Sequence, residues 1–306
     1  MKVTKLMGVL LAGVGILNLT AINEGLMVVA TNTLVADWVH EVAGDKIRLK
    51  TLVGPNSDVH SFEPSPQDVQ RLSQADLIFE NGLGLEYWLN ALYKASDSKA
   101  VRISLSDGLP LLPYEDCGHE CHTHGHLMDN DPHVWLDVQN VILMVKRIET
   151  VLIQYDPANK VYYHSKANDY IKKLQELDEW IFAQIQSIPV NNRKLITNHN
   201  NFRYFAKRYG LTILGSVLHS ATTEGTGPSA RKFTQLIKLI RQYNIPAVFG
   251  ENVQNPVLIR QLAKEAHLPP PEILYTEALG STNELAKNYV ELMRYDVNTL
   301  VKGLGK

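Results

Sequence analysis

The feature that most constrains the fold is a long stretch of helical pattern in the middle of the chain, Asp156–Ile188. It contains no glycine, and its only proline is Pro157. Asp156 is a residue type that favours the N-cap, and proline is well tolerated at the first helical position. The pattern predicts one helix about 45–50 Å long. Its polar outer face is set against an apolar stripe of Val161, Ile171, Leu174, Leu177, Ile181 and Ile185.

On both sides of this helix, strand-like and helix-like segments alternate. The predicted strands are Leu26–Asn32, Lys46–Val53, Asp76–Glu80 and Val101–Leu105 before it, and Lys194–Asn198, Leu211–Val217, Pro246–Gly250 and Ile273–Thr276 after it. Such alternation predicts mainly parallel sheets covered by helices. The expected fold class is α/β: two (βα)4-type lobes, residues 26–155 and 189–306, joined by one long rigid backbone helix, residues 156–188.

The first 21 residues read as a secretory signal peptide. Lys2 and Lys5 give a positive start, and Leu6–Leu17 is an apolar run too short to span a bilayer comfortably. A buried first strand or an uncleaved anchor are the alternatives. No cysteine follows the apolar run, so we expect no lipid anchor and a soluble, monomeric protein of the periplasm. The formal net charge of −2 gives no reason to expect nucleic acid as a partner.

Four residues are candidate ligands of a metal ion. His60 and His133 precede the long helix, whereas His199 and Glu277 follow it. At least three of the four lie at or beyond the carboxyl ends of predicted strands, where open α/β sheets bind their ligands. Three imidazoles and one carboxylate suit zinc or another first-row divalent metal. We therefore expect a metal site in the cleft between the two lobes, although each residue alone is a weak signal.

Four segments resemble the metal receptors of bacterial zinc and manganese ABC importers, the ZnuA/TroA-like family. They are DVHSFEPSPQDVQRLSQADLIFENGLGLE, DPHVWLDVQN, TNHNNFRYFAKRYGL and ILYTEALG, and the resemblance runs from about Val28 to the C-terminus. It implies two small α/β lobes on one backbone helix with the metal between them. It also implies a membrane permease as the partner, and the family's four ligand positions fall on His60, His133, His199 and Glu277.

The sequence departs from the family pattern in two places. The fourth ligand of the family is usually aspartate, so the longer Glu277 must start further from the metal or bind it in a different mode. The family often has Asp-Pro before the first histidine, and here the pair is Asp58-Val59. Family members specialised for manganese often carry glutamate where this chain has His199. The extra nitrogen donor favours Zn2+, with Mn2+ or Fe2+ as the alternative.

A short tract rich in cysteine and histidine, residues 117–126, lies between the predicted strand Val101–Leu105 and His133. We interpret it as a secondary metal loop that captures the ion through His119, His122, His124 and His126. Cys117 and Cys121 are compatible with a small disulfide in an oxidising compartment. A loop without any metal role is the alternative.

Binding is favoured over catalysis because four protein donors leave no open position for water. The predicted function is a high-affinity zinc receptor that delivers the ion to a permease, and not an enzyme. A zinc hydrolase with water in the fourth position is a weaker alternative, since no HExxH helix is present. A surface adhesin is a third. Glu251 is a candidate to hold a ligand histidine, and Trp135 and Phe202 are expected in the core.

Overall fold

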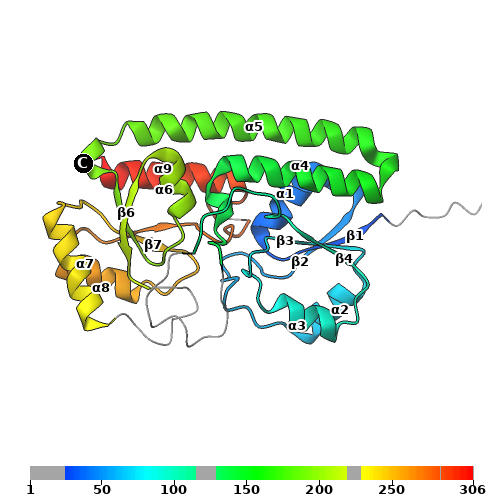
Figure 1. The fold of residues 1–306 in the computed structure, drawn as a ribbon, viewed down its shortest axis with the longest axis horizontal. Coiled ribbons are helices and arrows are strands. Elements are labelled where there is room, and N and C mark those ends of the chain that lie inside the picture. Colours follow the sequence, from blue (N-terminus) through cyan, green and yellow to red (C-terminus); the bar gives the residue numbers. More distant parts are fainter. Residues whose placement is uncertain (1–24, 115–128, 219–228, 283, 306) are drawn as a thin grey trace, which may run out of the picture.

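The computed structural model describes residues 25–114, 129–218, 229–282 and 284–305. Its long helix, α5 (Lys160–Gln186), lies along one side of the molecule (Figure 1). With 27 residues it spans about 40 Å. It begins later than predicted, because residues 157–159 form a separate 3-10 turn. Asp156 accepts hydrogen bonds from the Tyr163 hydroxyl and the Asn159 amide, and it does not cap the backbone.

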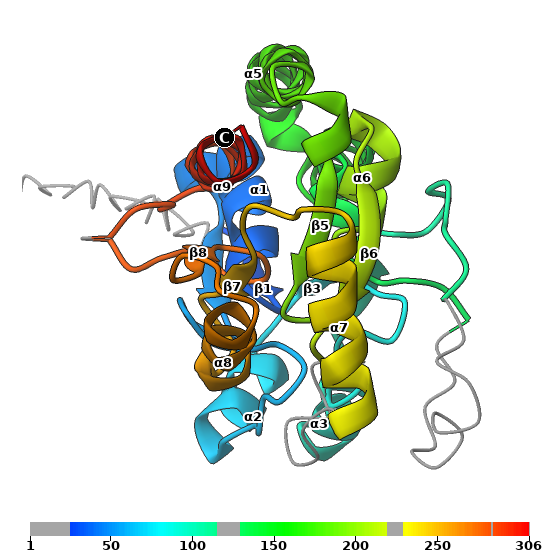
Figure 2. The same ribbon diagram turned by 90° about the vertical axis from the view of Figure 1, so that its left-hand side faces the viewer.

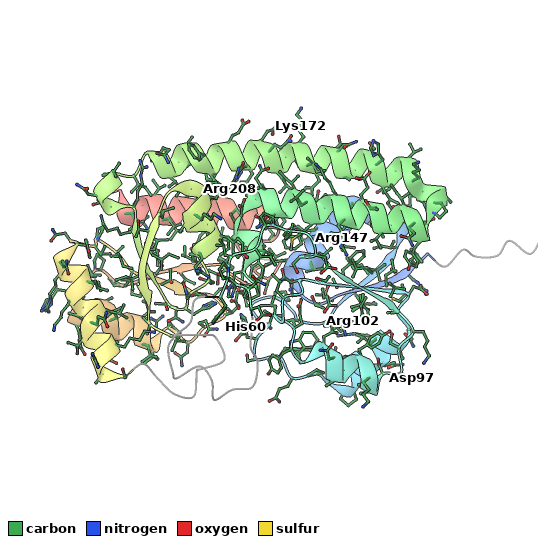
Figure 3. All side chains as sticks on the ribbon, viewed as in Figure 1. His60, Asp97, Arg102, Arg147, Lys172 and Arg208 are labelled. Atoms are coloured by element: carbon green, nitrogen blue, oxygen red, sulfur yellow. The ribbon has the colours of Figure 1, made fainter. Side chains whose placement is uncertain are left out.

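In the described part of the chain, the main contacts of the inner face of α5 are with other helices. Leu174, Leu177 and Ile181 are buried as predicted, whereas Val161 is 84% exposed and the prediction was wrong for it. Lys172 points away from the body of the molecule (Figure 3). The helices that contact α5 are α1 (Thr33–Ala43), α4 (Val138–Tyr155), α6 (Arg203–Tyr209) and α9 (Tyr289–Leu304). These helices come from both sides of α5 in the sequence. The helix α5 therefore packs on both the first part of the chain, which precedes it, and the second part, which follows it.

The first part of the chain forms one parallel sheet with the order β2-β1-β3-β4. The strands are β1 (Met27–Ala30), β2 (Arg48–Thr51), β3 (Leu77–Glu80) and β4 (Val101–Ser104), and α2 (Pro66–Ser73) and α3 (Leu89–Ala95) complete this part. Val28 pairs with Leu49 on one side and with Leu77 on the other. All four residues of β3 are buried, as expected for a strand covered on both faces.

In the second part of the chain, the residues that the structure describes form four strands as two parallel pairs, and not one continuous sheet. They are β5 (Lys194–Thr197) with β6 (Thr212–Ser216), and β7 (Phe249–Glu251) with β8 (Glu272–Leu274); the helices α7 (Ala230–Gln242) and α8 (Val257–Glu265) lie beside them (Figure 2). β5 and β7 are neighbours in space. The register of the first pair shifts between Leu195 and Ile196, so its ladder is irregular.

One cluster of buried apolar side chains extends from β1 through α5 to α9, and a smaller one lies under α7 and α8. A buried polar network adds to it, in which Asp178 of α5 accepts hydrogen bonds from Arg208, Tyr209 and Gln139. The larger cluster includes side chains from before, within and after α5, so it does not mark where one lobe ends. The predicted lobe boundaries stay a prediction. Among the described helices, none is both long and apolar enough to cross a membrane.

Candidate metal centre

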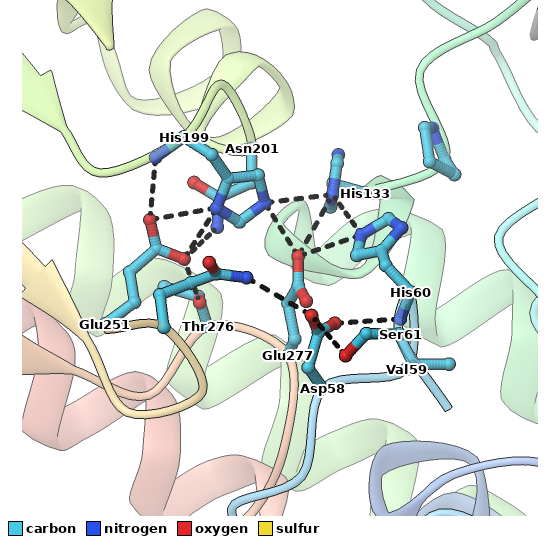
Figure 4. Close-up of polar contacts among 12 residues, drawn as sticks. Asp58, Val59, His60, Ser61, His133, His199, Asn201, Glu251, Thr276 and Glu277 are labelled. Atoms are coloured by element: carbon cyan, nitrogen blue, oxygen red, sulfur yellow. Dashed lines mark hydrogen bonds and ion pairs between the residues drawn. The ribbon is translucent and has the colours of Figure 1, made fainter. Parts of the chain in front are cut away.

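The four predicted ligands converge in the middle of the molecule (Figures 3 and 4). His60 lies in the loop after β2, and His133 immediately precedes a 3-10 turn, Val134–Leu136. His199 follows β5 by two residues, and Glu277 follows β8 by three. All four side chains are buried, with residue exposures between 1% and 4%. Burial of three imidazoles and one carboxylate needs compensation, which the side chains provide for one another.

The donor atoms face a common point. Glu277 Oε1 lies 3.2 Å from His60 Nε2, 3.2 Å from His133 Nε2 and 2.7 Å from His199 Nε2. His133 Nε2 is 3.4 Å from the Nε2 atoms of both other histidines. One donor atom from each residue lies within 4.8 Å of the others. Four donors at about 2.1 Å from a zinc ion in a tetrahedron would be roughly 3.4 Å apart, so the constellation has the dimensions of a metal site.

The carboxylate of Glu277 is ionised in this environment. Burial alone would raise its pKa, but His60 and His199 outweigh burial and hold the pKa well below the usual range. Its second oxygen, Oε2, is buried without a hydrogen-bond partner in the described part of the chain. A buried, unpaired carboxylate oxygen is costly, and a cation beside it would remove that cost.

Two of the histidines are protonated more readily than a free imidazole. Burial lowers the pKa of His133, but Asp131 and Glu277 outweigh it and raise the pKa. For His199 the opposing charges are Glu251 and Glu277, and its pKa is raised well above the ordinary value. A cation at the common point would therefore compete with protons on these two rings.

Carboxylates behind the rings orient two of the histidines. His133 Nδ1 lies 2.7 Å from Asp131 Oδ1, and His199 Nδ1 lies 2.8 Å from Glu251 Oε2. An Nδ1–H that donates to a carboxylate leaves the Nε2 lone pair directed at the centre. Glu251 is itself held by the Thr276 hydroxyl at 2.8 Å and the Asn201 amide at 3.0 Å (Figure 4). The prediction for Glu251 thus corresponds to a real contact.

Asp131 was not predicted to have a role, although the sequence contains a signal for it. Asp58 stands two residues before His60, and Asp131 stands two residues before His133. In both cases the aspartate Oδ1 accepts the histidine backbone N–H, at 2.8 Å and 3.0 Å. The repeated Asp-x-His spacing therefore marks two local turns that present a histidine.

An aromatic side chain, Trp135, lies beside one of the ligand rings. Trp135 is buried 5.4 Å from the His133 ring, and its indole N–H donates to the Thr276 carbonyl at 2.8 Å. This bond joins the His133 segment to the residue before Glu277. Phe202 is also buried, as expected. The histidines of the predicted secondary loop, His119, His122, His124 and His126, lie outside the described residues with Cys117 and Cys121, as does the predicted signal peptide.

Comparison with known proteins identifies relatives along nearly the whole chain. Residues 28–303 match the family model ZnuA, described as the periplasmic component A of a zinc-uptake complex. The manganese-binding lipoprotein MntA of Halalkalibacterium halodurans is 32% identical over 285 residues, covering 92% of this chain and 90% of the relative. The manganese ABC transporter substrate-binding lipoprotein PsaA of Streptococcus anginosus is 30% identical, with the same coverage.

Solved structures show the same fold. The periplasmic zinc-binding protein TroA of Treponema pallidum superimposes with a TM-score of 0.79, at 26% identity, covering 92% of this chain and all of the other. A manganese-bound periplasmic metal-binding protein of Candidatus Liberibacter asiaticus has the same TM-score at 22% identity, covering 90% of this chain and 98% of the other. The predicted α/β fold with a long backbone helix is thereby confirmed.

Proposed function

Because the chain belongs to the ZnuA family of periplasmic metal-uptake components, we propose that it is an exported receptor that binds one divalent metal ion and delivers it to an ABC permease. The observation that carries the proposal is the convergence of four buried donors from four separate segments. In this proposal His60, His133 and His199 bind as neutral imidazoles through Nε2, and Glu277 is the anionic ligand. Their local segments are those on which the family resemblance rests.

For the ion itself we propose manganese, the alternative to the zinc predicted from the sequence. Two relatives at 30% identity or more are named for manganese, whereas the family description and TroA are named for zinc. The unpaired Glu277 Oε2 offers a fifth donor atom, which is an oxygen. A site of this kind suits Mn2+ better than a closed tetrahedron of four donors does. Three imidazoles nevertheless bind zinc well. We therefore expect the site to bind Zn2+ more tightly than Mn2+. In this proposal Mn2+ is nevertheless the ion delivered, because the supply of each metal decides which one is bound.

Competition between the two metals tests this choice. We expect one metal per chain, and we expect Zn2+ to displace Mn2+ in vitro, because affinity rises from manganese to zinc for a given set of donors. Elemental analysis of protein purified from its native compartment then reports the cargo. Manganese in excess of zinc supports the proposal, and zinc alone at full occupancy would restore the original prediction.

Proton release is a second expected result. Because the pKa values of His133 and His199 are raised in the metal-free site, both rings carry protons at a higher pH than a free imidazole. Binding near neutral pH should release about one to two protons per metal, and the apparent affinity should fall as the pH falls. Calorimetry in two buffers with different ionisation enthalpies measures this number. Identical heats in both buffers would contradict it.

We propose a binding role and not catalysis. Apart from the proposed ligand Glu277, the carboxylates that contact the rings are Asp131 and Glu251. Both are occupied in holding His133 and His199, so neither is available as a general base for water. We expect the metal-loaded chain to give up its metal to a chelator and to show no hydrolytic activity towards esters and peptides.

Export and the monomeric state are also part of the proposal. The relatives quoted above are named as lipoproteins, whereas the only two cysteines of this chain are Cys117 and Cys121, far from the apolar N-terminal run. The relatives therefore do not support the expected absence of a lipid anchor, and the proposal is limited to an exported, monomeric protein. Cell fractionation with mass measurement of the mature chain tests this, and light scattering tests the monomer.

A further inference from the structure

The first turn of α6 makes a set of contacts that the proposed metal site does not by itself explain. Tyr204 is 3% exposed, and its hydroxyl donates to the Asp131 carbonyl at 3.0 Å. The same hydroxyl accepts the Leu112 backbone N–H at 2.9 Å. One side chain from the second part of the chain thus binds two backbone segments of the first part.

Arg203, its neighbour, contacts the same two segments. Its Nη1 donates to the Pro113 carbonyl at 2.6 Å and lies 3.6 Å from Asp131 Oδ2. That carboxylate oxygen is buried and has no hydrogen-bond partner in the described part of the chain, so the guanidinium is its nearest compensating charge. The other oxygen, Oδ1, holds His133.

The two segments also pair with each other. Residues 112–114 and 129–131 run antiparallel: the Asp131 N–H donates to the Leu112 carbonyl at 2.9 Å, and the Tyr114 N–H donates to the Asp129 carbonyl at 3.0 Å. An isolated bridge joins Pro113 and Asn130. Neither backbone segment belongs to the main sheet, so the contacts from α6 fix where Asp131 sits.

We propose that Arg203 and Tyr204 are positioning residues for the metal site, acting through Asp131 on His133. They follow His199 by four and five residues, so a single short segment carries one ligand and holds the support of another. The pair thereby sets the distance between the His199 and His133 rings across the two parts of the chain. This inference rests on the proposed metal-binding function and assigns it two residues that contact no metal.

The test is Tyr204→Phe, which keeps the buried ring and removes both hydroxyl bonds. Metal dissociation is followed after adding excess chelator to the Mn2+-loaded full chain, and the visible spectrum of the Co2+-loaded chain reports ligand geometry. We expect dissociation about five- to tenfold faster and a changed cobalt spectrum, a smaller effect than loss of a residue that touches a ligand ring. Arg203→Gln should shift both readouts in the same direction, and it decides the question if Tyr204→Phe does not fold.

Tyr93→Phe is the matched control, because the Tyr93 hydroxyl donates to the Ala100 carbonyl at 2.8 Å in the first part of the chain. It should lower the melting temperature of the metal-free protein about as much as Tyr204→Phe, with dissociation and spectrum unchanged. If Tyr204→Phe behaves like this control, the inference is overturned while the metal site stands. If the unaltered chain binds neither Mn2+ nor Co2+, the proposed function fails and the inference fails with it.

Discussion

Replacement of both His60 and His133 by alanine is expected to abolish tight metal binding. The double substitution removes two of three nitrogen donors and leaves His199 and Glu277 as a two-donor remnant. A loss of at least about 1,000-fold is expected, which corresponds to roughly 4 kcal/mol. Competition against a chelator of known affinity, with Mn2+ and with Zn2+, measures it.

The matched control is His40→Ala with His164→Ala, which also removes two imidazoles. Both histidines are exposed, and His164 pairs with Glu149 on the surface of the helices. This variant should bind as the unaltered chain does. If the His60 and His133 double variant stays within about threefold of that affinity, the four-residue site is not where the metal binds.

The four candidate ligands were accessible from the sequence because their positions follow from local rules. His199 and Glu277 come shortly after β5 and β8, and parallel strands present the residues beyond their carboxyl ends at one edge. His60 and His133 are each presented by an Asp-x-His turn. Such signals depend on neighbours a few residues away, which the sequence displays directly.

The partners of those ligands were less accessible, since they depend on contacts between distant segments. Glu251 reaches His199 across 52 residues, and Tyr204 reaches Asp131 across 73. The start of α5 has a local reason instead: Asp156 has the residue type of a cap, but its carboxylate accepts the hydroxyl of Tyr163, seven residues later. Val161 fitted the helical period, yet it faces solvent, whereas Tyr163 two residues later is fully buried.

How the strands after α5 pair with one another was also not predictable from the alternation of strand-like and helix-like segments alone. The sequence pattern indicates four strands after α5, and the described residues of that region contain four. Whether they form one ladder or two depends on register, and the shift between Leu195 and Ile196 is not visible as a change in hydrophobic pattern.

Glu251→Gln is expected to weaken metal binding about 10- to 100-fold, the usual effect of losing the carboxylate behind a ligand histidine. Glu251 accepts from His199 Nδ1, the His199 backbone N–H, the Asn201 amide and the Thr276 hydroxyl. Glutamine has one acceptor oxygen and an NH2 group, so at least one of these donors must face another donor. The His199 ring is then free to turn its Nε2 away from the centre.

Chelator competition measures the affinity of this variant, and Glu272→Gln is its control. Glu272 opens β8, close to Glu251 in the ladder, but it is exposed and pairs with Lys302. The control should bind normally. A fall in the melting temperature of metal-free Glu251→Gln, with its affinity for Mn2+ and Zn2+ unchanged, would show that Glu251 only stabilises the fold. The orientation of His199 would then have to come from the strand end alone.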